Sequence, residues 1–394
     1  ISMISLFCSF VKILNRLLGQ IQKTKRGKRL VRSQLEQVSR IDNYPVFQNS
    51  LSPLGFYNEY NCQAESVFVI AAGNAGDIGY SELEFWAADD CYFYEHSNDI
   101  HQKYLYYYFL LNQKTIAEQT RRTSIPRLSR DILDNLVLQL PEVAEQEAIA
   151  DTLTVFDTHI ANLTELIEKK KAVREGALED LISGKTRLSG FTGKWETVNF
   201  ESVIIPKARI GWQGLKSDEY LRKGFCYLIG GTDFYNGTVS LDNIWFVSEE
   251  RYAMDANIQV EENDVLVTKD GTIGKIALVP HLEKPATLNS GVFVFRTKNG
   301  LTRQFLYRVL ISSIFRGFID TLAAGSTIKH LYQKDLKNFS FSIPTDEAEQ
   351  EAIATVLNTM DYEILSLKEE RDKMIKIREG AMDDLLTGKV RLTD

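Results

Sequence analysis

The sequence predicts a duplicated α+β fold, in which two globular α/β modules are separated by two long antiparallel coiled-coil helices and related by a pseudo-two-fold axis. Three observations support this prediction. A fifteen-residue phrase occurs twice, as REGALEDLISGKTRL at 174–188 and as REGAMDDLLTGKVRL at 378–392. A heptad pattern leads into each copy of the phrase. Glycine-broken, β-rich runs lie upstream of both copies, and a chain of 394 residues has room for two or three domains.

The repeat is longer than the phrase. It begins with AEQEAIA, which occupies 144–150 and returns at 348–354, and the two copies then stay in register without a gap. About half of the paired positions are identical. Solenoid proteins stack many short repeats, whereas this chain has two widely separated copies. The repeat therefore indicates an internal duplication of a larger module.

Each copy of the repeat predicts a long helix, because its apolar residues alternate steps of four and three, as in the a/d seam of a coiled coil. The seam residues are Ile149, Leu153, Phe156, Ile160, Leu163 and Ile167 in the first copy, and Ile353, Leu357, Met360, Ile364 and Leu367 in the second. Pro141 and Pro344 precede the helices, and Gly184 and Gly388 suit C-terminal caps. Each helix would have about 40 residues and a length of about 60 Å. Two such seams are expected to pack on each other; the alternative is two separate amphipathic helices, each packed on its own module.

The segments before the two helices also correspond. FVIAAGNAGDIGY at 68–80 resembles VLVTKDGTIGKIAL at 265–278, and each reads as strand, glycine turn and strand. An aromatic-rich helical stretch follows each, at 104–112 and 305–313. We therefore expect a first module, a central helix, a second module and a C-terminal helix, with the following boundaries: 1–140, 141–188, 189–343 and 344–394.

Composition and cysteine usage narrow the class of protein. The four cysteines lie far apart without a CxxC pair, which argues against a zinc site or a disulfide framework and fits a reducing compartment such as the cytoplasm. The apolar opening ISMISLFCSFVKIL has no basic n-region and is too short to span a bilayer, so we expect a buried strand or helix there and no membrane partner. The net charge of −7 does not by itself suggest nucleic acid, so the distribution of charge has to decide.

No pattern in the sequence indicates catalysis, a metal or a cofactor bound by this chain. SGKT at 183–186 lacks the glycine of a phosphate-binding loop, because Glu179 stands in its place, and DGTIGK has Lys269 at the same position. Asp264 and Lys269 could form part of a nuclease-like pattern, but metal-assisted cleavage requires further placed carboxylates. The five histidines show no ligand spacing.

Positive charge is clustered in both modules, as expected of residues that neutralise DNA phosphates. In the first module the candidates are Lys23, Lys25, Arg26, Lys28, Arg29 and Arg32, and then Arg121, Arg122 and Arg127. In the second module they are Lys207, Arg209 and Lys216 around Trp212, and Lys329 beside His330. For any single cluster a merely solvated surface is an equal alternative. Because the long helices are acidic, the basic loops are expected to be the DNA-binding surfaces.

With these repeats, and with the stretches YPVFQNS, GTIGK and GSTIKHL, the chain resembles the specificity subunit of a type I restriction-modification system. The resemblance implies two target-recognition domains that each read half of a split DNA site, and two conserved helices packed antiparallel. It also implies no catalytic activity, no cofactor on this chain, two methyltransferase subunits carrying S-adenosylmethionine, and restriction subunits for cleavage. One departure concerns the start of each module: GKWETVNFESV opens the second, whereas the first has FCSFVKILNRLLGQI without tryptophan, so its first strand is expected to be degenerate or mis-started.

Base readout would come from loop residues that reach the major groove. The candidates are Gln48 and Asn49, Lys269 and Asp270, and Lys329 and His330, for which phosphate contact or a structural role is an equal alternative. The helical pair would fix the separation of the half-sites, as a ruler does. Two rival functions remain open: a fused or degenerate nuclease or methyltransferase, and a coiled-coil adaptor that binds no DNA.

Overall fold

The computed structural model describes residues 14–120, 126–211, 214–324 and 330–392. The chain divides into two compact units, and the boundaries fall inside the two long helices. The first unit contains the chain up to Glu165 together with everything from Lys368 onward, and the second unit contains 166–367. Each unit therefore holds one globular module and a part of both long helices.

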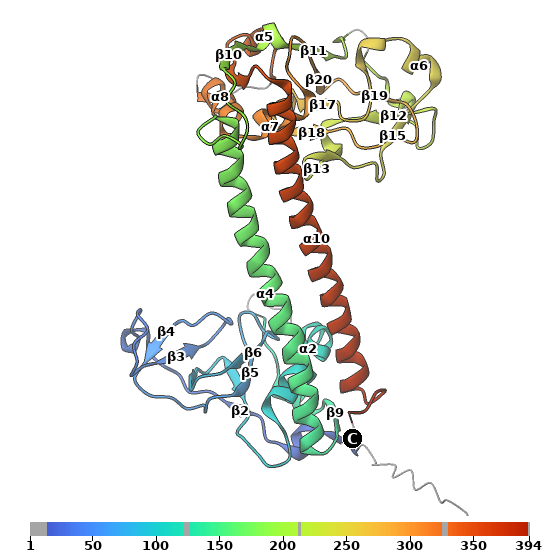
Figure 1. Ribbon diagram of the computed structural model, residues 1–394. Coiled ribbons are helices and arrows are strands. Elements are labelled where there is room, and N and C mark those ends of the chain that lie inside the picture. Colours follow the sequence, from blue (N-terminus) through green and yellow to red (C-terminus); the bar gives the residue numbers. More distant parts are fainter. Residues whose placement is uncertain (1–13, 121–125, 212–213, 325–329, 393–394) are drawn as a thin grey trace, which may run out of the picture. The chain divides into compact units, whose positions relative to one another are not determined.

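The first unit is built on a four-stranded sheet with strand order β2-β8-β5-β6, beside a three-stranded sheet of order β4-β3-β7 and the antiparallel pair β1-β9. Helix α2 packs on β5 and β6, and apolar side chains from these elements form the core. Figure 1 shows β5, β6 and α2 at the same end of α4. The elements are β1 (Leu14–Leu17), α1 (Leu18–Ile21), β2 (Lys25–Arg26), β3 (Tyr44–Phe47), β4 (Gly55–Tyr57), β5 (Ser66–Ile70), β6 (Ile78–Ser81), β7 (Trp86–Ala87), β8 (Cys91–Phe93), α2 (Gln102–Glu118), α3 (Arg130–Asp134), β9 (Val137–Leu140) and α4 (Val143–Ile182).

The second unit has a six-stranded sheet with strand order β11-β20-β17-β18-β14-β13, a four-stranded sheet of order β15-β12-β19-β16 and the antiparallel pair β10-β21. Helix α7 covers β17, β18 and β20. The elements are β10 (Trp195–Asn199), α5 (Phe200–Val203), β11 (Ile204–Ala208), β12 (Cys226–Ile229), β13 (Phe234–Tyr235), β14 (Thr238–Val239), β15 (Trp245–Val247), α6 (Glu249–Ala253), β16 (Gln259–Val260), β17 (Val265–Thr268), β18 (Ile276–Leu278), β19 (Ala286–Leu288), β20 (Val292–Thr297), α7 (Arg303–Ile311), α8 (Ser313–Ala324), α9 (Gln333–Leu336), β21 (Ser340–Pro344) and α10 (Glu347–Leu386).

The strand pairings confirm that the modules are copies of one fold. The antiparallel pair β5-β6 corresponds to β17-β18, and the parallel pair β3-β7 corresponds to β12-β19. One difference stands out. The second module adds the hairpin β13-β14 outside β18, whereas β6 is the outer strand of its sheet.

The module openings also correspond: a first strand forms in both, although the first module lacks the tryptophan. β1 pairs with β9 over four residues, in the place where β10 pairs with β21 in the second module. Leu18 is then buried at the start of α1, as Phe200 is at the start of α5. Residues 1–13, with most of the apolar opening, lie outside the described residues.

The long helices have the predicted length, 40 residues each. Both end at a glycine in the left-handed region, because φ is +72° at Gly184 and +68° at Gly388. The backbone N–H of Thr186 donates to the carbonyl of Asp180 across the first cap, and Val390 N–H donates to Asp384 across the second. Within the described parts of the chain, no helix is long and apolar enough to cross a bilayer.

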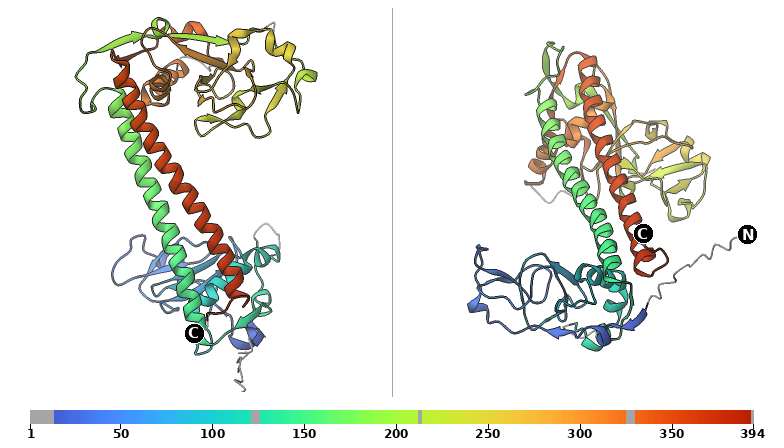
Figure 2. Two further views of the ribbon diagram at one scale, coloured as in Figure 1. Left: turned by 45° about the vertical axis from the view of Figure 1, so that its right-hand side comes forward. Right: turned by 60° about the horizontal axis from the view of Figure 1, so that its bottom comes forward.

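The residues of the predicted seam are buried or half-buried, and the ends of the seam also pack on the modules. In the first unit, Ile149 and Leu153 of α4 lie in one apolar cluster with Leu385 and Leu386 of α10 and with the core of the module. In the second unit the corresponding cluster joins α10, the end of α4 and the second module. Both views in Figure 2 show α4 and α10 side by side. Helix-on-helix and helix-on-module packing are therefore combined, where the sequence left them as alternatives.

Candidate nucleic-acid interface

In the first module, three chain segments meet at the turn between β5 and β6. The backbone N–H of Asn74 in this turn donates to the carbonyl of Asn49 at 3.1 Å, and Leu128 N–H donates to the carbonyl of Ala71 at 2.8 Å. Arg127 forms a β-bridge with Ala72. The side chains of Asn49, Asn74 and Arg127 are exposed. These three residues are called the first edge below.

The second module repeats this arrangement. Leu331 N–H donates to the carbonyl of Lys269 at 2.8 Å, and Asp270 forms a β-bridge with His330. The His330 ring also lies against the Asp270 carboxylate, with 2.6 Å between Nδ1 and Oδ1. Lys269 is half-buried, and its ammonium lies 5.6 Å from the centre of the Phe293 ring. Lys269, Asp270 and His330 are called the second edge.

The two edges share a backbone frame but not their side chains. The predicted readout residues Asn49, Lys269, Asp270 and His330 all lie on the edges, and Gln48 is a half-buried neighbour whose carbonyl accepts from the Cys91 thiol. Sequence reasoning missed Asn74. Asn74 lies between two glycines in the β5–β6 turn, which is equivalent to the GTIGK turn of the second module. This position could have identified Asn74 from the sequence. Lys329 lies outside the described residues.

The basic stretch of the first module is divided between paired and exposed residues. Lys25 forms an ion pair with Glu95, and Arg26 donates through Nε to the carbonyl of Asp89 at 2.7 Å. The remaining members are exposed, with no ion pair among the described residues: Lys23, Lys28, Arg29 and Arg32. The local partners of Lys25 and Arg26 favour a structural role for these two.

The basic candidates of the second module also differ in accessibility. Lys216 is exposed, and Lys207 is half-buried on β11, where it pairs with Val294 of β20. Arg121, Arg122 and Trp212 lie outside the described residues.

The prediction that Arg209 contacts DNA is wrong, because the Arg209 side chain is only 2% exposed. Its guanidinium donates through Nε to the carbonyl of Leu288 at 3.0 Å and lies 3.5 Å from the Thr287 hydroxyl. Burial of the charge lowers the pKa of Arg209. A side chain held inside the module in this way cannot reach a phosphate, so its role is to link β11 to β19.

A family model matches residues 14–172 and 194–376, one match for each module. Its description is "type I restriction modification DNA specificity domain". The chain belongs to this family. Its function is accordingly DNA sequence specificity in a type I restriction-modification system, as the resemblance had implied.

Similar proteins and a solved structure agree with the family match. The MjaVIII specificity subunit of Methanocaldococcus jannaschii is 27% identical over 305 residues, which cover 73% of this chain and 70% of the relative. The EcoBI specificity subunit of Escherichia coli is 25% identical over 295 residues, covering 68% and 61% of the two chains. The crystal structure of a type I S subunit from M. genitalium has the same fold, with a TM-score of 0.65, 19% identity and coverage of 96% and 97%.

Several residues repeated in this specificity subunit form internal contacts that sequence reasoning missed. In the second unit, Arg187 makes a two-pronged pair with Glu349, at 2.9 Å and 2.6 Å. In the first unit, Arg391 makes the equivalent pair with Glu145. The arginine follows the end of one long helix and the glutamate lies at the start of the other, so the helices run antiparallel in each unit. The Arg391 hydrogen bond lowers the pKa of Glu145.

The repeated glutamines tie each module to its long helix. Gln146 accepts a hydrogen bond from His101 N–H at 2.9 Å, and its amide donates to the carbonyls of Asp99 and Pro141. In the second module, Gln350 accepts from Thr302 N–H at 2.9 Å and donates to the carbonyls of Gly300 and Pro344. Both glutamines are fully buried. Identity at these repeat positions therefore maintains the fold and leaves only the exposed positions available for a partner.

Proposed function

We propose that this chain is the non-catalytic subunit that reads a bipartite DNA target, with one half-site read by each module. The observation that carries the proposal is the pair of edges, which place different side chains on one repeated backbone frame. A duplicated frame gives two similar approaches to a duplex, and different side chains on it give different half-sites.

The side chains of both edges suit hydrogen bonds to base edges in the major groove. The side-chain amide of Asn49 or Asn74 could form hydrogen bonds with N6 and N7 of adenine. The Arg127 guanidinium could form hydrogen bonds with O6 and N7 of guanine. In the second edge the Asp270 carboxylate can accept from the N4 amino group of cytosine, and Lys269 can donate to guanine. Each such pair discriminates against a wrong base by about 1–3 kcal/mol. The exposed lysines and arginines of 23–32 would contact phosphates and set the register.

We further propose that two methyltransferase subunits dock on the long helices, and that restriction subunits join for cleavage. S-adenosylmethionine would bind to the methyltransferases, and the complex would act in the cytoplasm. The support is a pair of exposed glycines at equivalent helix positions, Gly176 and Gly380. A Cβ added at either would meet no atom of this chain within 4 Å. Because glycine inside a helix costs roughly 0.5–1 kcal/mol relative to alanine, close approach of an identical partner at both positions accounts for its presence.

The test is to map methylated sites after substitution of one edge at a time, in the complex with its methyltransferase subunits. Asn49→Ala with Arg127→Ala should relax one half-site and leave the other unchanged. Asp270→Asn with His330→Ala should relax only the other half-site. Lys223→Ala, at an exposed lysine outside the candidate DNA-binding set, is a matched control for loss of a surface charge in a module. The proposal fails if either edge variant alters both half-sites, or if neither alters any.

The two rival functions make different predictions for the purified chain. A coiled-coil adaptor would show no retention on DNA, whereas a DNA reader should bind and then elute as salt rises. A degenerate enzyme would methylate or cut DNA alone when given S-adenosylmethionine or a divalent metal. We expect salt-dependent retention and no modification of the DNA by the isolated chain.

A further inference from the structure

We propose that the outer edge of β6, with the cleft beside it, accepts an extended segment of the methyltransferase subunit that docks on the first unit. This inference rests on the proposed function. It adds a contact that the second unit lacks, and so makes the two methyltransferase sites unequal.

The first observation is the open edge itself. β6 pairs with β5 on one side, and no described strand pairs with its other side. The hydrogen bond from Ile70 N–H to the carbonyl of Asp77 fixes the phase of the antiparallel ladder. Because hydrogen-bonded and non-hydrogen-bonded pairs alternate, the backbone groups of Ile78 and Tyr80 face outward. An exposed row of this kind is a template for strand addition.

The second module shows what such an edge accepts, because its own hairpin occupies the equivalent place. Leu278 of β18 is the counterpart of Tyr80, and its N–H donates to the carbonyl of Gly237 at 2.9 Å. Thr238 of β14 pairs with Leu278, and its hydroxyl donates to the Leu278 carbonyl at 3.2 Å. The hairpin also covers Tyr307 of α7, since a Cβ added at Gly237 would lie 2.4 Å from the Tyr307 hydroxyl.

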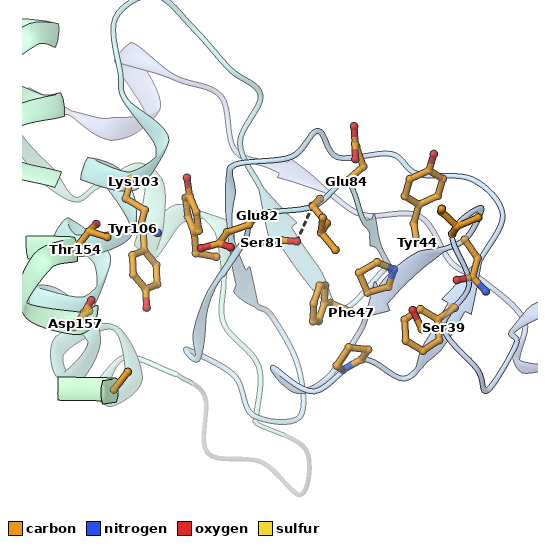
Figure 3. Close-up of a pocket in the computed structure, with 18 of the residues that line it drawn as sticks. Ser39, Tyr44, Phe47, Ser81, Glu82, Glu84, Lys103, Tyr106, Thr154 and Asp157 are labelled. Atoms are coloured by element: carbon orange, nitrogen blue, oxygen red, sulfur yellow. Dashed lines mark hydrogen bonds between the residues drawn. The ribbon is translucent and has the colours of Figure 1, made fainter. Parts of the chain in front are cut away.

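In the first module the same place is a cleft of about 900 Å³. Tyr106 of α2, the counterpart of Tyr307, lines it together with Tyr80 and Ser81 of β6. Figure 3 shows Tyr106 on one side of the cleft and Phe47 on the other, with Ser81 between them. The first module therefore has the surface that the hairpin covers in the second module, but no described strand of the chain covers it.

The walls of the cleft indicate the chemistry of its occupant. Leu83 is 64% exposed and Ile41 is fully exposed, so the occupant should bring apolar side chains. Glu82 and Glu84 also line the cleft, and no ion pair to either is found in the described part of the chain. The lysine of the cleft, Lys103, is stacked on the Tyr80 ring at 4.1 Å. An extended segment with apolar residues and a lysine or arginine fits these walls, whereas the carboxylates disfavour a DNA phosphate.

The position of the cleft points to the methyltransferase as the source of that segment. One wall is the exposed face of α4, where Thr154, Thr158 and Ala161 line the cleft. A methyltransferase bound to the helices of the first unit would thus reach the cleft without leaving its docking surface. Strand addition would supply main-chain hydrogen bonds, and the apolar walls would select alternate side chains.

The experiment compares Tyr80→Pro with Tyr80→Ala in the full chain, with the purified methyltransferase subunit titrated by calorimetry. Both variants lose the Tyr80 ring, but only proline removes the outward N–H, and an outer strand tolerates proline at such a position. We expect two unequal sites in the unchanged protein. Tyr80→Pro should weaken the tighter site about tenfold relative to Tyr80→Ala, the effect of losing the one hydrogen bond that this N–H would donate. Glu82→Lys with Glu84→Lys should weaken the same site, whereas the control pair Glu59→Lys and Glu118→Lys should not.

The outcomes separate this inference from the proposed function. Two equal sites that neither cleft variant changes would overturn the strand-acceptor role and leave the proposed function intact. No methyltransferase binding by the unchanged protein would overturn the proposed docking itself. If Glu82→Lys with Glu84→Lys instead tightens binding of a short duplex without affecting the methyltransferase, the cleft is a nucleic-acid groove and the inference is wrong.

Discussion

Replacement of Arg391 by glutamine should destabilise the first unit, because Arg391 satisfies a nearly buried carboxylate. Its Nε donates to Glu145 Oε1 at 2.7 Å, a terminal guanidinium nitrogen donates to Oε2, and Leu392 N–H reaches Oε1 at 3.2 Å. Glu145 is 8% exposed. Glutamine keeps much of the length of the side chain but removes the charge and the two-pronged geometry.

The size of the effect follows from the burial of the two partners. Removal of one member of a fully buried pair costs about 3–5 kcal/mol, because the other charge is left without compensation. The Arg391 side chain is 24% exposed, so water can partly replace it, and we expect a loss of about 2–3 kcal/mol at pH 7. This is a large share of the roughly 5–15 kcal/mol that stabilises a typical domain.

The effect should depend on pH with a defined sign. Because Arg391 lowers the pKa of Glu145 in the folded protein below the ordinary 4.5, the pair stabilises fully above that ordinary value. The stabilisation is lost as pH falls through the lowered pKa of the folded state. The difference between wild type and Arg391→Gln should therefore be constant near neutral pH and should shrink in acid.

Hydrogen exchange at increasing urea is the suitable assay, because it reports each unit separately where the two units need not unfold together. Amides of α2 and of the first turns of α4 should lose protection, and those of α7 should not. Lys389→Gln is the control: Lys389 pairs with Asp383 on the surface, and loss of such an exposed pair should change the stability little. If Arg391→Gln costs no more than this control at pH 7, the pair does not stabilise the unit as argued.

Two further predictions concern DNA. Lys28→Ala with Arg29→Ala should reduce the magnitude of the slope of log K against log salt by about two, one for each phosphate that the variant no longer neutralises. Arg26→Ala should change this slope little, because Arg26 already binds the Asp89 carbonyl. Filter binding across salt concentrations measures both slopes. Four residues inserted after Glu165 and four after Leu367 should lengthen both helices by about 6 Å and widen the gap between unchanged half-sites by about two base pairs, as methylation mapping would show.

The sequence predicted best those features that depend on local patterns. A seam of alternating steps of four and three, ended by Gly184 and Gly388, defined both helices at their observed length because helix period and capping are local properties. Contacts between the two long helices explain why both must be lengthened together. Lys170 forms an ion pair with Glu363 across the helices of the second unit at 2.7 Å, so an insertion in one helix alone would shift such pairs out of register.

Burial of charged residues could not be predicted in the same way. Arg209 looked like one more cation in a basic loop, but it directly follows β11, and the carbonyl it binds belongs to β19, far along the chain. That neighbour is fixed by sheet topology and not by residue type. The open edge of β6 is a similar case, although the signal for the hairpin that covers its counterpart was present: Asn236 and Gly237 have φ of +49° and +79°, as a two-residue hairpin turn requires.

The repeat itself has two physical causes that the structure separates. Buried repeated residues such as Gln146 and Glu349, and the half-buried Arg187, have partners inside the chain, so a change at any of them costs stability whether or not a partner protein binds. Exposed repeated residues such as Gly176 and Gly380 have no such partners, so fold stability alone would favour alanine there. The two edges obey neither constraint, because their frame is held by backbone hydrogen bonds that do not depend on side-chain identity. A duplicated specificity subunit can therefore keep its helices while the residues of each edge change, and on the proposed function we expect a change in one edge to alter one half-site without disturbing the other.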